Sequence, residues 1–168
     1  MTEIVLAVLI AAAFASDVRT MRIPNWLTVG GAGCGLALQS FLFGWQGAWG
    51  SVLGLLTGFG IVLLLHAVGA VGAGDVKLFG AIGALSSVPF VLSALTYSIL
   101  YAACIGIIVL VVKRKLLTTV RFAAVSVSML VAFKDSQVIS RWKRGTAMHF
   151  PFMLAVAPGS VTAYFLGL

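Results

Sequence analysis

Long apolar runs, bordered by the few charged residues, constrain this chain more than any other feature. The runs lie at about residues 2–17, 26–43, 48–67, 76–88, 89–112 and 149–167. A membrane helix needs roughly 20 apolar residues, and most of the runs approach that length. Because 61% of the residues are hydrophobic and only 9% are charged, a soluble domain of this size could not bury its apolar surface. We therefore predict an all-α polytopic membrane protein of about six transmembrane helices, forming a single domain over residues 1–168.

The basic residues predict how the runs are oriented. Arg19 and Arg22 follow the first run, Lys77 precedes the fourth, and the other basic residues lie between the fifth and sixth. Six spans place all of them on one face, which the positive-inside rule makes cytoplasmic. We expect a multi-pass protein of the inner (cytoplasmic) membrane with both termini outside. The first run should stay as a membrane helix, since no basic region precedes it as in a signal peptide.

Segment 116–133 tests this topology. It is apolar and 18 residues long, but it carries one arginine and four hydroxyl side chains. If it spanned the membrane, Arg141, Lys143 and Arg144 would move to the outer face. We therefore predict an interfacial or re-entrant helix within a long cytoplasmic loop.

Two acidic residues point to the function. The chain has only four acids, and Asp17 and Asp75 each lie at the end of an apolar run. An ionised carboxylate near hydrocarbon is costly, so it marks a functional site by default. A pair of carboxyl groups is also sufficient for hydrolysis by acid–base catalysis, with one acting as the acid and the other as the base. Each residue alone has a simpler interpretation, because either could cap a helix, and Asp17 could instead pair with a nearby arginine.

The residues around Asp75 add to this hypothesis. Gly72 and Gly74 would let the backbone bend sharply and let a substrate strand approach. Lys77 falls in the first turn of the expected helix, where it opposes the helix dipole, so it should have another partner. A lipid headgroup and a substrate carboxylate are both open as that partner.

The segment after Asp17 predicts a turn. In Ile23-Pro24-Asn25, proline fixes φ and asparagine suits the N-cap of the second span. We expect these three residues to hold the loop's shape and not to react.

Glycine spacing predicts where helices pack closely. Gly50, Gly54 and Gly58 recur every four residues in the third run, and Gly31 and Gly35 do so in the second. Small residues at this spacing let membrane helices approach each other closely. Such packing would fix the distance between the helices that carry the two aspartates.

Metal, cofactor and nucleic-acid sites are not expected. Cys34 and Cys104 lie inside apolar runs without ligand spacing, and His66 and His149 lie at run ends, where histidines usually act as polar anchors. The net charge of +7 comes from residues at run ends and in one loop, with no aromatic-interleaved groove. We expect membrane lipids, not nucleic acid, to face these cations.

Two motifs together resemble a known family. Gly72-Ala73-Gly74-Asp75 is similar to the GxGD signature of membrane aspartic proteases. With Ile23-Pro24-Asn25 after Asp17 and Val76-Lys77-Leu78 after Asp75, the chain resembles type IV prepilin peptidases. Its small size resembles the short tight-adherence branch of that family.

This resemblance implies an activity. Such enzymes remove a short basic leader from prepilin-like proteins on the cytoplasmic side, just before the pilin's hydrophobic helix, for pilus biogenesis or secretion. Asp17 and Asp75 match the catalytic pair, and no cofactor is needed. Larger members also N-methylate the new terminus and carry a cysteine-rich insertion. Only residues 18–25 separate Asp17 from the second span, so the resemblance implies a peptidase without methyltransferase activity.

Other functions remain open from the residues alone. A GxGD protease that cuts within the bilayer would place Asp17 and Asp75 deeper in apolar sequence. A proton- or ion-coupled transporter would carry acids at mid-membrane and internal repeats. A non-catalytic assembly scaffold would need neither aspartate. The sequence indicates neither which prepilin is cleaved, nor which aspartate holds a proton, nor an oligomeric state.

Overall fold

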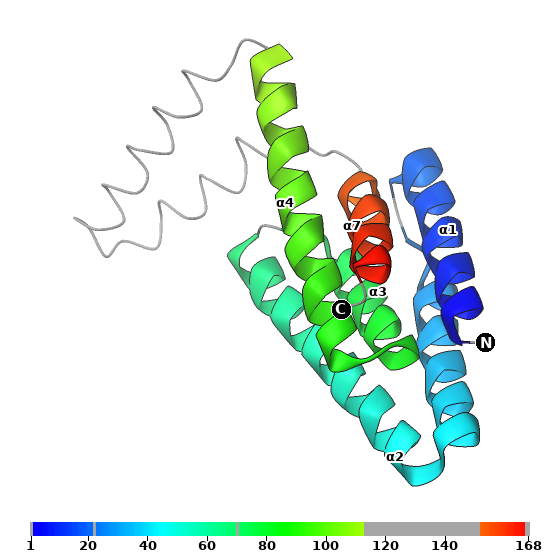
Figure 1. Ribbon diagram of the computed structural model, residues 1–168. Coiled ribbons are helices and arrows are strands. Elements are labelled where there is room, and N and C mark those ends of the chain that lie inside the picture. Colours follow the sequence, from blue (N-terminus) through cyan, green and yellow to red (C-terminus); the bar gives the residue numbers. More distant parts are fainter. Residues whose placement is uncertain (1, 22, 70, 113–151, 167–168) are drawn as a thin grey trace. The chain divides into compact units, whose positions relative to one another are not determined.

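The secondary structure of the described part of the chain is α-helical, with short connections between the helices. The computed structural model describes residues 2–21, 23–69, 71–112 and 152–166 (Figure 1). Its helices are α1 (Thr2–Thr20), α2 (Asn25–Val68), α3 (Ala73–Leu85), α4 (Val88–Val112) and α7 (Met153–Phe165). No strand occurs among these residues, so the all-α class is confirmed for them. Segment 116–133, expected as an interfacial helix, lies outside the described residues, as does His149.

The chain divides into two compact units. The first comprises residues 1–102 and 151–168, and the second comprises residues 103–150. Only the end of α4 is described in the second unit. The helices and cavities discussed below lie in the first unit.

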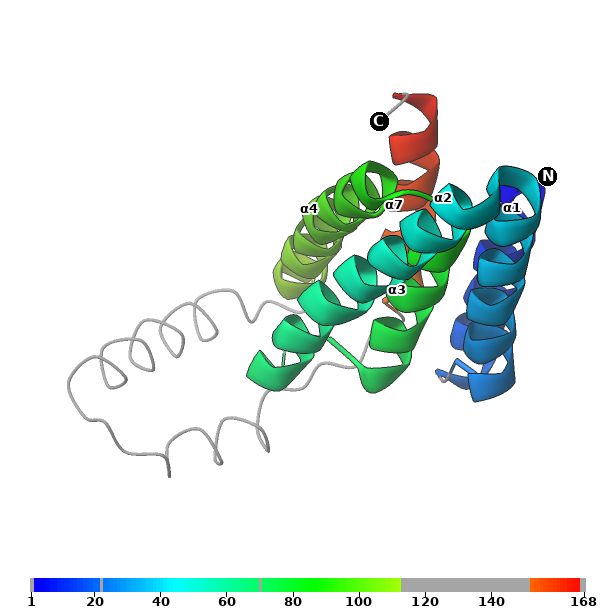
Figure 2. The same ribbon diagram turned by 90° about the horizontal axis from the view of Figure 1, so that it is seen from below.

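Helix α2 is two helical arms joined at a glycine. Its 44 residues bend at Gly44, where φ is 59° and ψ is −141°. Only glycine adopts such a conformation at little cost, because it has no Cβ. The arms, residues 25–43 and 45–68, form a V in Figures 1 and 2. They correspond to the second and third apolar runs of the sequence.

The short helix α3 is the most buried element. From Leu78 to Leu85 all its residues are buried, and it packs mainly against α2. Gly54 of α2 and Gly83 of α3 face each other so closely that a Cβ on either would overlap the other's carbonyl oxygen. A Cβ on Gly58 would likewise overlap the carbonyl oxygen of Phe79. The predicted close packing is thus confirmed at Gly54 and Gly58.

Of the other predicted glycines, Gly35 and Gly31 pack against neighbouring helices and Gly50 does not. A Cβ on Gly35, in the first arm of α2, would lie 2.7 Å from the carbonyl of Ala84, so this glycine also contacts the backbone of α3. A Cβ on Gly31 would instead meet the Leu9 side chain of α1 at 2.6 Å. Gly50 has open space beside it, so its predicted packing role is wrong. The regular spacing was too coarse a signal, because the arm touches α3 only over part of its length.

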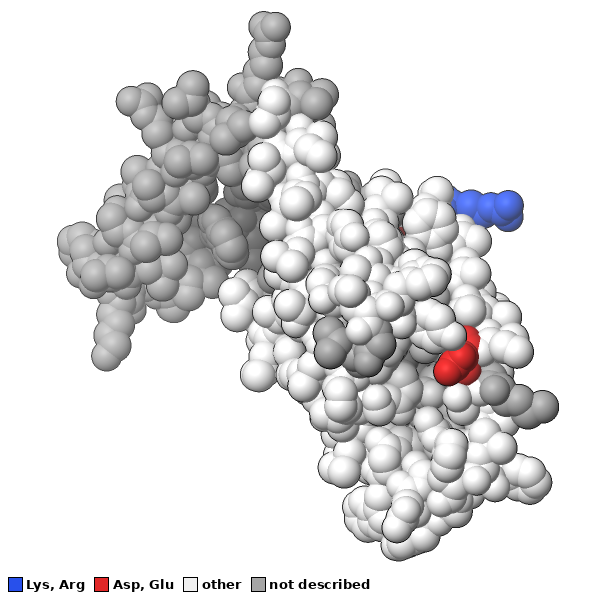
Figure 3. Space-filling view, viewed as in Figure 1, with Lys and Arg blue, Asp and Glu red and all other residues white. Residues whose placement is uncertain are grey.

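The exposed surface of the described helices suits a membrane. Among them, α2 and residues Val88–Val109 of α4 are long and apolar enough to cross a bilayer. Large apolar side chains point outward along the bundle, including Phe41, Leu64 and Phe165. The face shown in Figure 3 is mostly free of charged side chains where it is described. Helices α3 and α7, with 13 residues each, reach only about 20 Å. The expected count of six spans therefore stays a prediction.

Candidate active site

Asp17 and Asp75 line one cavity. Asp17 lies in the last turn of α1, and Asp75 lies in the first turn of α3. The cavity has a volume of about 340 Å³, and each aspartate is only 7% exposed. The residues that line it are Asp17, Met21, Ile23, Asn25, Gly72, Ala73, Gly74, Asp75 and Lys77. Except for Pro24, the structure brings all the sequence-predicted site residues to this cavity.

A turn directly after α1 positions Asp17. The Met21 N–H donates to the carbonyl of Asp17 at 2.8 Å, and Met21 adopts a left-handed conformation with φ of 50°. Pro24 is extended, with φ of −68°, and α2 begins at the next residue. The left-handed Met21 and the extended Pro24 thus belong to the short connection between α1 and α2, and no turn is centred on Pro24 itself. This connection reverses the chain within a few residues, so that Ile23 and Asn25 face the same cavity as Asp17.

The loop before α3 positions Asp75. Gly69 ends α2 with φ of 86°, and its N–H donates to the carbonyl of His66. The His66 side chain also contacts this loop, because its Nδ1 lies 2.7 Å from the Val71 carbonyl oxygen. Since a carbonyl only accepts, Nδ1 carries the proton there. His66 therefore ties the loop to the end of α2 and lies outside the cavity lining.

Asp75 is not the residue that caps α3. The N-cap is Gly72, and Asp75 is the third helical residue, so the capping interpretation of Asp75 is wrong. Its carboxyl instead accepts a backbone hydrogen bond from Gly72, as an acid at this position often does. Asp75 also precedes the apolar segment 76–88 that was expected to cross the membrane.

The surroundings of Asp75 favour its protonated form. Burial raises the pKa of its carboxyl most, and the nearby charge of Asp17 raises it further. The hydrogen bond from Gly72 lowers it, and the net result is a rise from 3.8 to about 6. A carboxyl with a raised pKa can serve as a general acid near neutral pH.

Gly72 and Gly74 do not bend the chain as expected. Neither has a positive φ, and the bend of this loop is made at Gly69. Gly72 matters for space, because a Cβ there would lie 3.1 Å from Oδ2 of Asp75. A Cβ on Gly74 would lie 3.5 Å from the Ile23 side chain, which is ordinary contact. The absence of a side chain at Gly72 thus leaves room for the Asp75 carboxyl.

Lys77 and Asn25 link the two sequence motifs. The Lys77 Nζ donates to Asn25 Oδ1 at 2.8 Å. The expectation that Asn25 caps α2 is wrong, since Pro24 is the N-cap and no side chain bonds there. Lys77 was expected to face a headgroup or a substrate, and this protein partner was missed. The bond ties the start of α2 to the start of α3 beside Asp75.

Helix α7 contributes a contact that sequence reasoning missed. The backbone N–H of Met153, at the start of α7, donates to Oδ2 of Asp17 at 3.1 Å. Met153 is fully buried, so this bond is shielded from solvent. One signal was available, because the run at 149–167 was expected to begin on the same face as Asp17. The start of an α-helix has free N–H groups that bind carboxylates well.

The cavity offers proton chemistry. Among residues 2–21, 23–69, 71–112 and 152–166, no group of three or more His, Cys, Asp or Glu side chains could hold a metal ion. Cys34 and Cys104 are exposed and unpaired with each other. What the cavity supplies is two buried carboxyls with different surroundings. Such a pair can exchange protons with a water molecule and with a bound carbonyl group.

Comparison with known proteins gives one match. Residues 4–111 match a family model described as the type IV leader peptidase family. The matched range includes both aspartates, the turn at Ile23-Pro24-Asn25 and the loop before α3. No curated protein and no solved structure matches the chain significantly.

Proposed function

The chain belongs to the type IV leader peptidase family, and from that premise we propose that it is a membrane aspartic endopeptidase that removes the leader of prepilin-like proteins. Family membership implies aspartic-type peptidase activity in general. The prepilin substrate, the cytoplasmic face of the inner membrane and the role in pilus biogenesis or secretion are parts of the proposal. The observation that carries it is the pair Asp17 and Asp75, each 7% exposed, in one cavity at the ends of two helices.

The raised pKa of Asp75 suggests a role for each aspartate. Asp75 has the raised pKa, so it holds the proton and donates a hydrogen bond to the carbonyl oxygen of the bond to be cleaved. Asp17 is then the base that takes a proton from water, and the water oxygen attacks the carbonyl carbon. Its Oδ2 is held by the Met153 N–H. The pair titrates as a unit, so these roles describe its singly protonated state.

The second half of the reaction returns the pair to its starting state. In the tetrahedral intermediate the former carbonyl oxygen carries the proton from Asp75, and Asp17 carries the proton taken from water. Asp17 passes its proton to the leaving nitrogen as the C–N bond breaks. The C=O double bond re-forms, and the hydroxyl oxygen that came from the carbonyl returns its proton to Asp75. The products are a carboxylic acid on the leader and a free amine on the mature protein.

We also propose that the activity is hydrolysis alone. The segment between Asp17 and the start of α2 is the short turn described above. It holds no inserted domain in which a methyl donor could bind.

Conservative variants of the two aspartates test the proposal. Asp17→Asn and Asp75→Asn keep the shape of the side chain but cannot exchange the proton. Each should lower the cleavage rate of a prepilin by at least about 10³-fold, since acid–base groups contribute roughly 10²–10⁴-fold each. Cleavage is measured on gels in detergent with purified protein. Thermal unfolding of both variants shows whether they still fold.

The outcome that contradicts the proposal is specific. If either Asn variant folds and still cleaves at a rate near that of the wild type, the pair is not catalytic. If the wild type cleaves no prepilin-like protein, the substrate class is wrong.

A further inference from the structure

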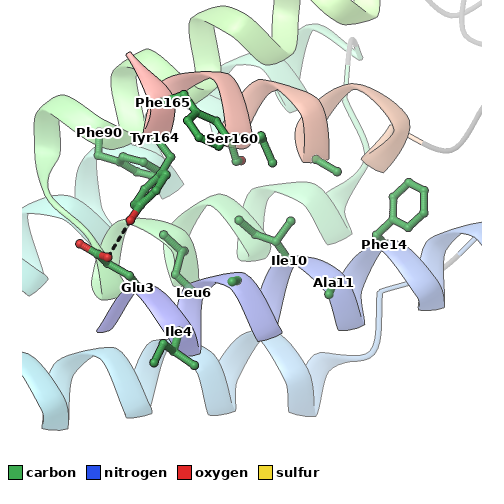
Figure 4. A pocket seen from close by; sticks show the side chains of 13 residues that line it. Glu3, Ile4, Leu6, Ile10, Ala11, Phe14, Phe90, Ser160, Tyr164 and Phe165 are labelled. Carbon is green, nitrogen blue, oxygen red and sulfur yellow. Dashed lines mark hydrogen bonds between the residues drawn. The ribbon is translucent and has the colours of Figure 1, made fainter. Parts of the chain in front are cut away.

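A second hollow lies between α1 and α7. It has a volume of about 580 Å³, and its lining includes the apolar side chains of Ala7, Ile10, Ala11 and Phe14 of α1. Figure 4 shows Ile10 and Ala11 along the hollow and Phe14 at the end away from Glu3. At one end the Tyr164 hydroxyl donates to Glu3 at 2.9 Å and joins α7 to α1. We call this hollow the α1–α7 groove.

The groove and the aspartate cavity lie along one face of α1. Glu3, Ala7, Ile10 and Phe14 line the groove, and Asp17 and Met21 line the cavity. From Glu3 to Asp17 the spacing alternates between four and three residues, so these five side chains form one stripe on α1, and Met21 lies in the turn directly after the helix. Phe14 lies less than one turn from Asp17. The groove therefore leads directly away from the candidate catalytic pair.

Helix α7 forms the opposite wall of the same path. Its first residue, Met153, binds Asp17 at the cavity end, and Tyr164 binds Glu3 at the far end. These two hydrogen bonds join α1 to α7 near Asp17 and at Glu3. From Glu3 to Phe14 the groove extends about 16 Å at 1.5 Å per residue, which matches about eleven residues of another helix.

We propose that the α1–α7 groove binds the apolar helix of the substrate, directly after the bond that is cleaved. This inference rests on the proposed function, in which the scissile bond precedes an apolar helix. A chain held at Asp17 and Asp75 must leave the cavity with that helix, and the groove is an apolar hollow that begins at Phe14, within one turn of Asp17 on the same helix. The exposed small side chains of Ala7 and Ala11 give a helix room for close approach.

Photo-crosslinking tests the groove without requiring turnover. The probe is a prepilin-type protein with a short basic leader and one apolar helix, bound to full-length Asp75→Asn enzyme in lipid nanodiscs. A benzophenone amino acid replaces Ala7 or Ala11 in the groove. It replaces Ala37, which is exposed on α2 and lines neither hollow, as the matched control. We expect crosslinks to the substrate's apolar helix at Ala7 and Ala11, at least about tenfold above those at Ala37.

Kinetics with two substrates gives an independent measurement. Ala11→Phe fills the groove and should raise the KM for the intact prepilin at least fivefold. It should leave unchanged the slow cleavage of a peptide that ends shortly after the scissile bond. Ala37→Phe should change neither.

The outcomes separate this inference from the proposed function. If the wild type cleaves the prepilin but the groove crosslinks only to lipid, or no more than Ala37 does, the groove is a lipid contact and the inference is overturned. Equal inhibition of both substrates by Ala11→Phe would also overturn it, because that result indicates damage to the catalytic pair. If the wild type cleaves nothing, the proposed function fails and the inference fails with it.

Discussion

Asp17 and Asp75 are equally buried but differ in what surrounds them. Asp17 accepts a hydrogen bond from Met153 at the start of α7, and Asp75 accepts one from Gly72 at the start of its own helix. For Asp75 this bond is outweighed by burial and by the charge of Asp17, so its pKa rises to about 6. These surroundings underlie the roles proposed above for the two aspartates.

The raised pKa of Asp75 predicts how cleavage depends on pH. Above pH 6 the protonated fraction of Asp75 falls about tenfold for each pH unit. We expect kcat/KM for a prepilin to fall roughly tenfold between pH 7 and pH 8, measured by initial rates in detergent. A flat profile over this interval would contradict the assignment of Asp75 as the proton donor.

The same pKa predicts a stability difference. A carboxyl whose pKa is higher in the folded state stabilises the fold below its unfolded pKa, and this stability is lost as the pH rises through about 6. Asp75→Asn does not titrate. Its free energy of unfolding relative to the wild type should therefore increase by about 2 kcal/mol between pH 4 and pH 7. Thermal unfolding across this range, in one detergent, provides the measurement.

Space beside the Asp75 carboxyl predicts a contrast between two glycines. Gly72→Ala would place a Cβ 3.1 Å from Oδ2 of Asp75, whereas Gly74→Ala would make ordinary contact with Ile23 at 3.5 Å. Moving a catalytic carboxyl by a few tenths of an ångström should cost about tenfold in kcat/KM, and Gly74→Ala should cost less than about threefold. Equal rates for the two variants would show that catalysis does not require the space that Gly72 leaves beside the Asp75 carboxyl.

At the scale of helices, the sequence predicted the elements better than their contacts. Asp17 and Asp75 were identifiable because ionisable side chains are rare in apolar sequence and each belongs to a motif. The bond between Met153 and Asp17 spans 136 positions and uses a backbone N–H, which every residue except proline carries. Because no particular residue type is needed for such a contact, the sequence could not predict it, and the structure was required.

The glycine seam between α2 and α3 shows the same limit. Spacing of four residues predicted Gly50, Gly54 and Gly58 as equals, but only Gly54 and Gly58 meet the backbone of α3. Spacing gives the face of a helix. It does not say where a short partner helix begins and ends along that face.

This seam predicts opposite effects for two identical substitutions on α2. Gly54→Ala would overlap the carbonyl of Gly83 and should destabilise the fold by about 1–3 kcal/mol, the usual cost of overpacking. Gly50→Ala has open space and should be neutral or stabilise by up to about 1 kcal/mol, because alanine favours a helix. Thermal unfolding of the two variants in one detergent compares them. If both variants lost stability, Gly50 would also contact a neighbouring helix, which contradicts the open space beside it.

At the scale of the whole chain, exposed tryptophans lie near the two ends of the first arm of α2. Trp45 and Trp49 are exposed beside the bend at Gly44, and Trp26 is exposed near the turn after α1. Tryptophan is enriched at both membrane–water interfaces. The aspartate cavity lies at the Trp26 end, where the exposed Lys77 is also found. This arrangement suits a first arm that crosses the bilayer, and the cytoplasmic orientation of the cavity stays a prediction.

The second arm of α2 provides the test of that orientation. From Gln46 to Val68 it covers 22 steps, or about 33 Å, close to the 30 Å hydrocarbon thickness of a bilayer. Both side chains are exposed. With Cys34 and Cys104 replaced by serine, Gln46→Cys should react in intact cells with a membrane-impermeant thiol reagent. Val68→Cys should react only after the membrane is permeabilised. The reverse pattern would place Asp17 and Asp75 on the outer face, where a leader that has not yet crossed the membrane could not reach them.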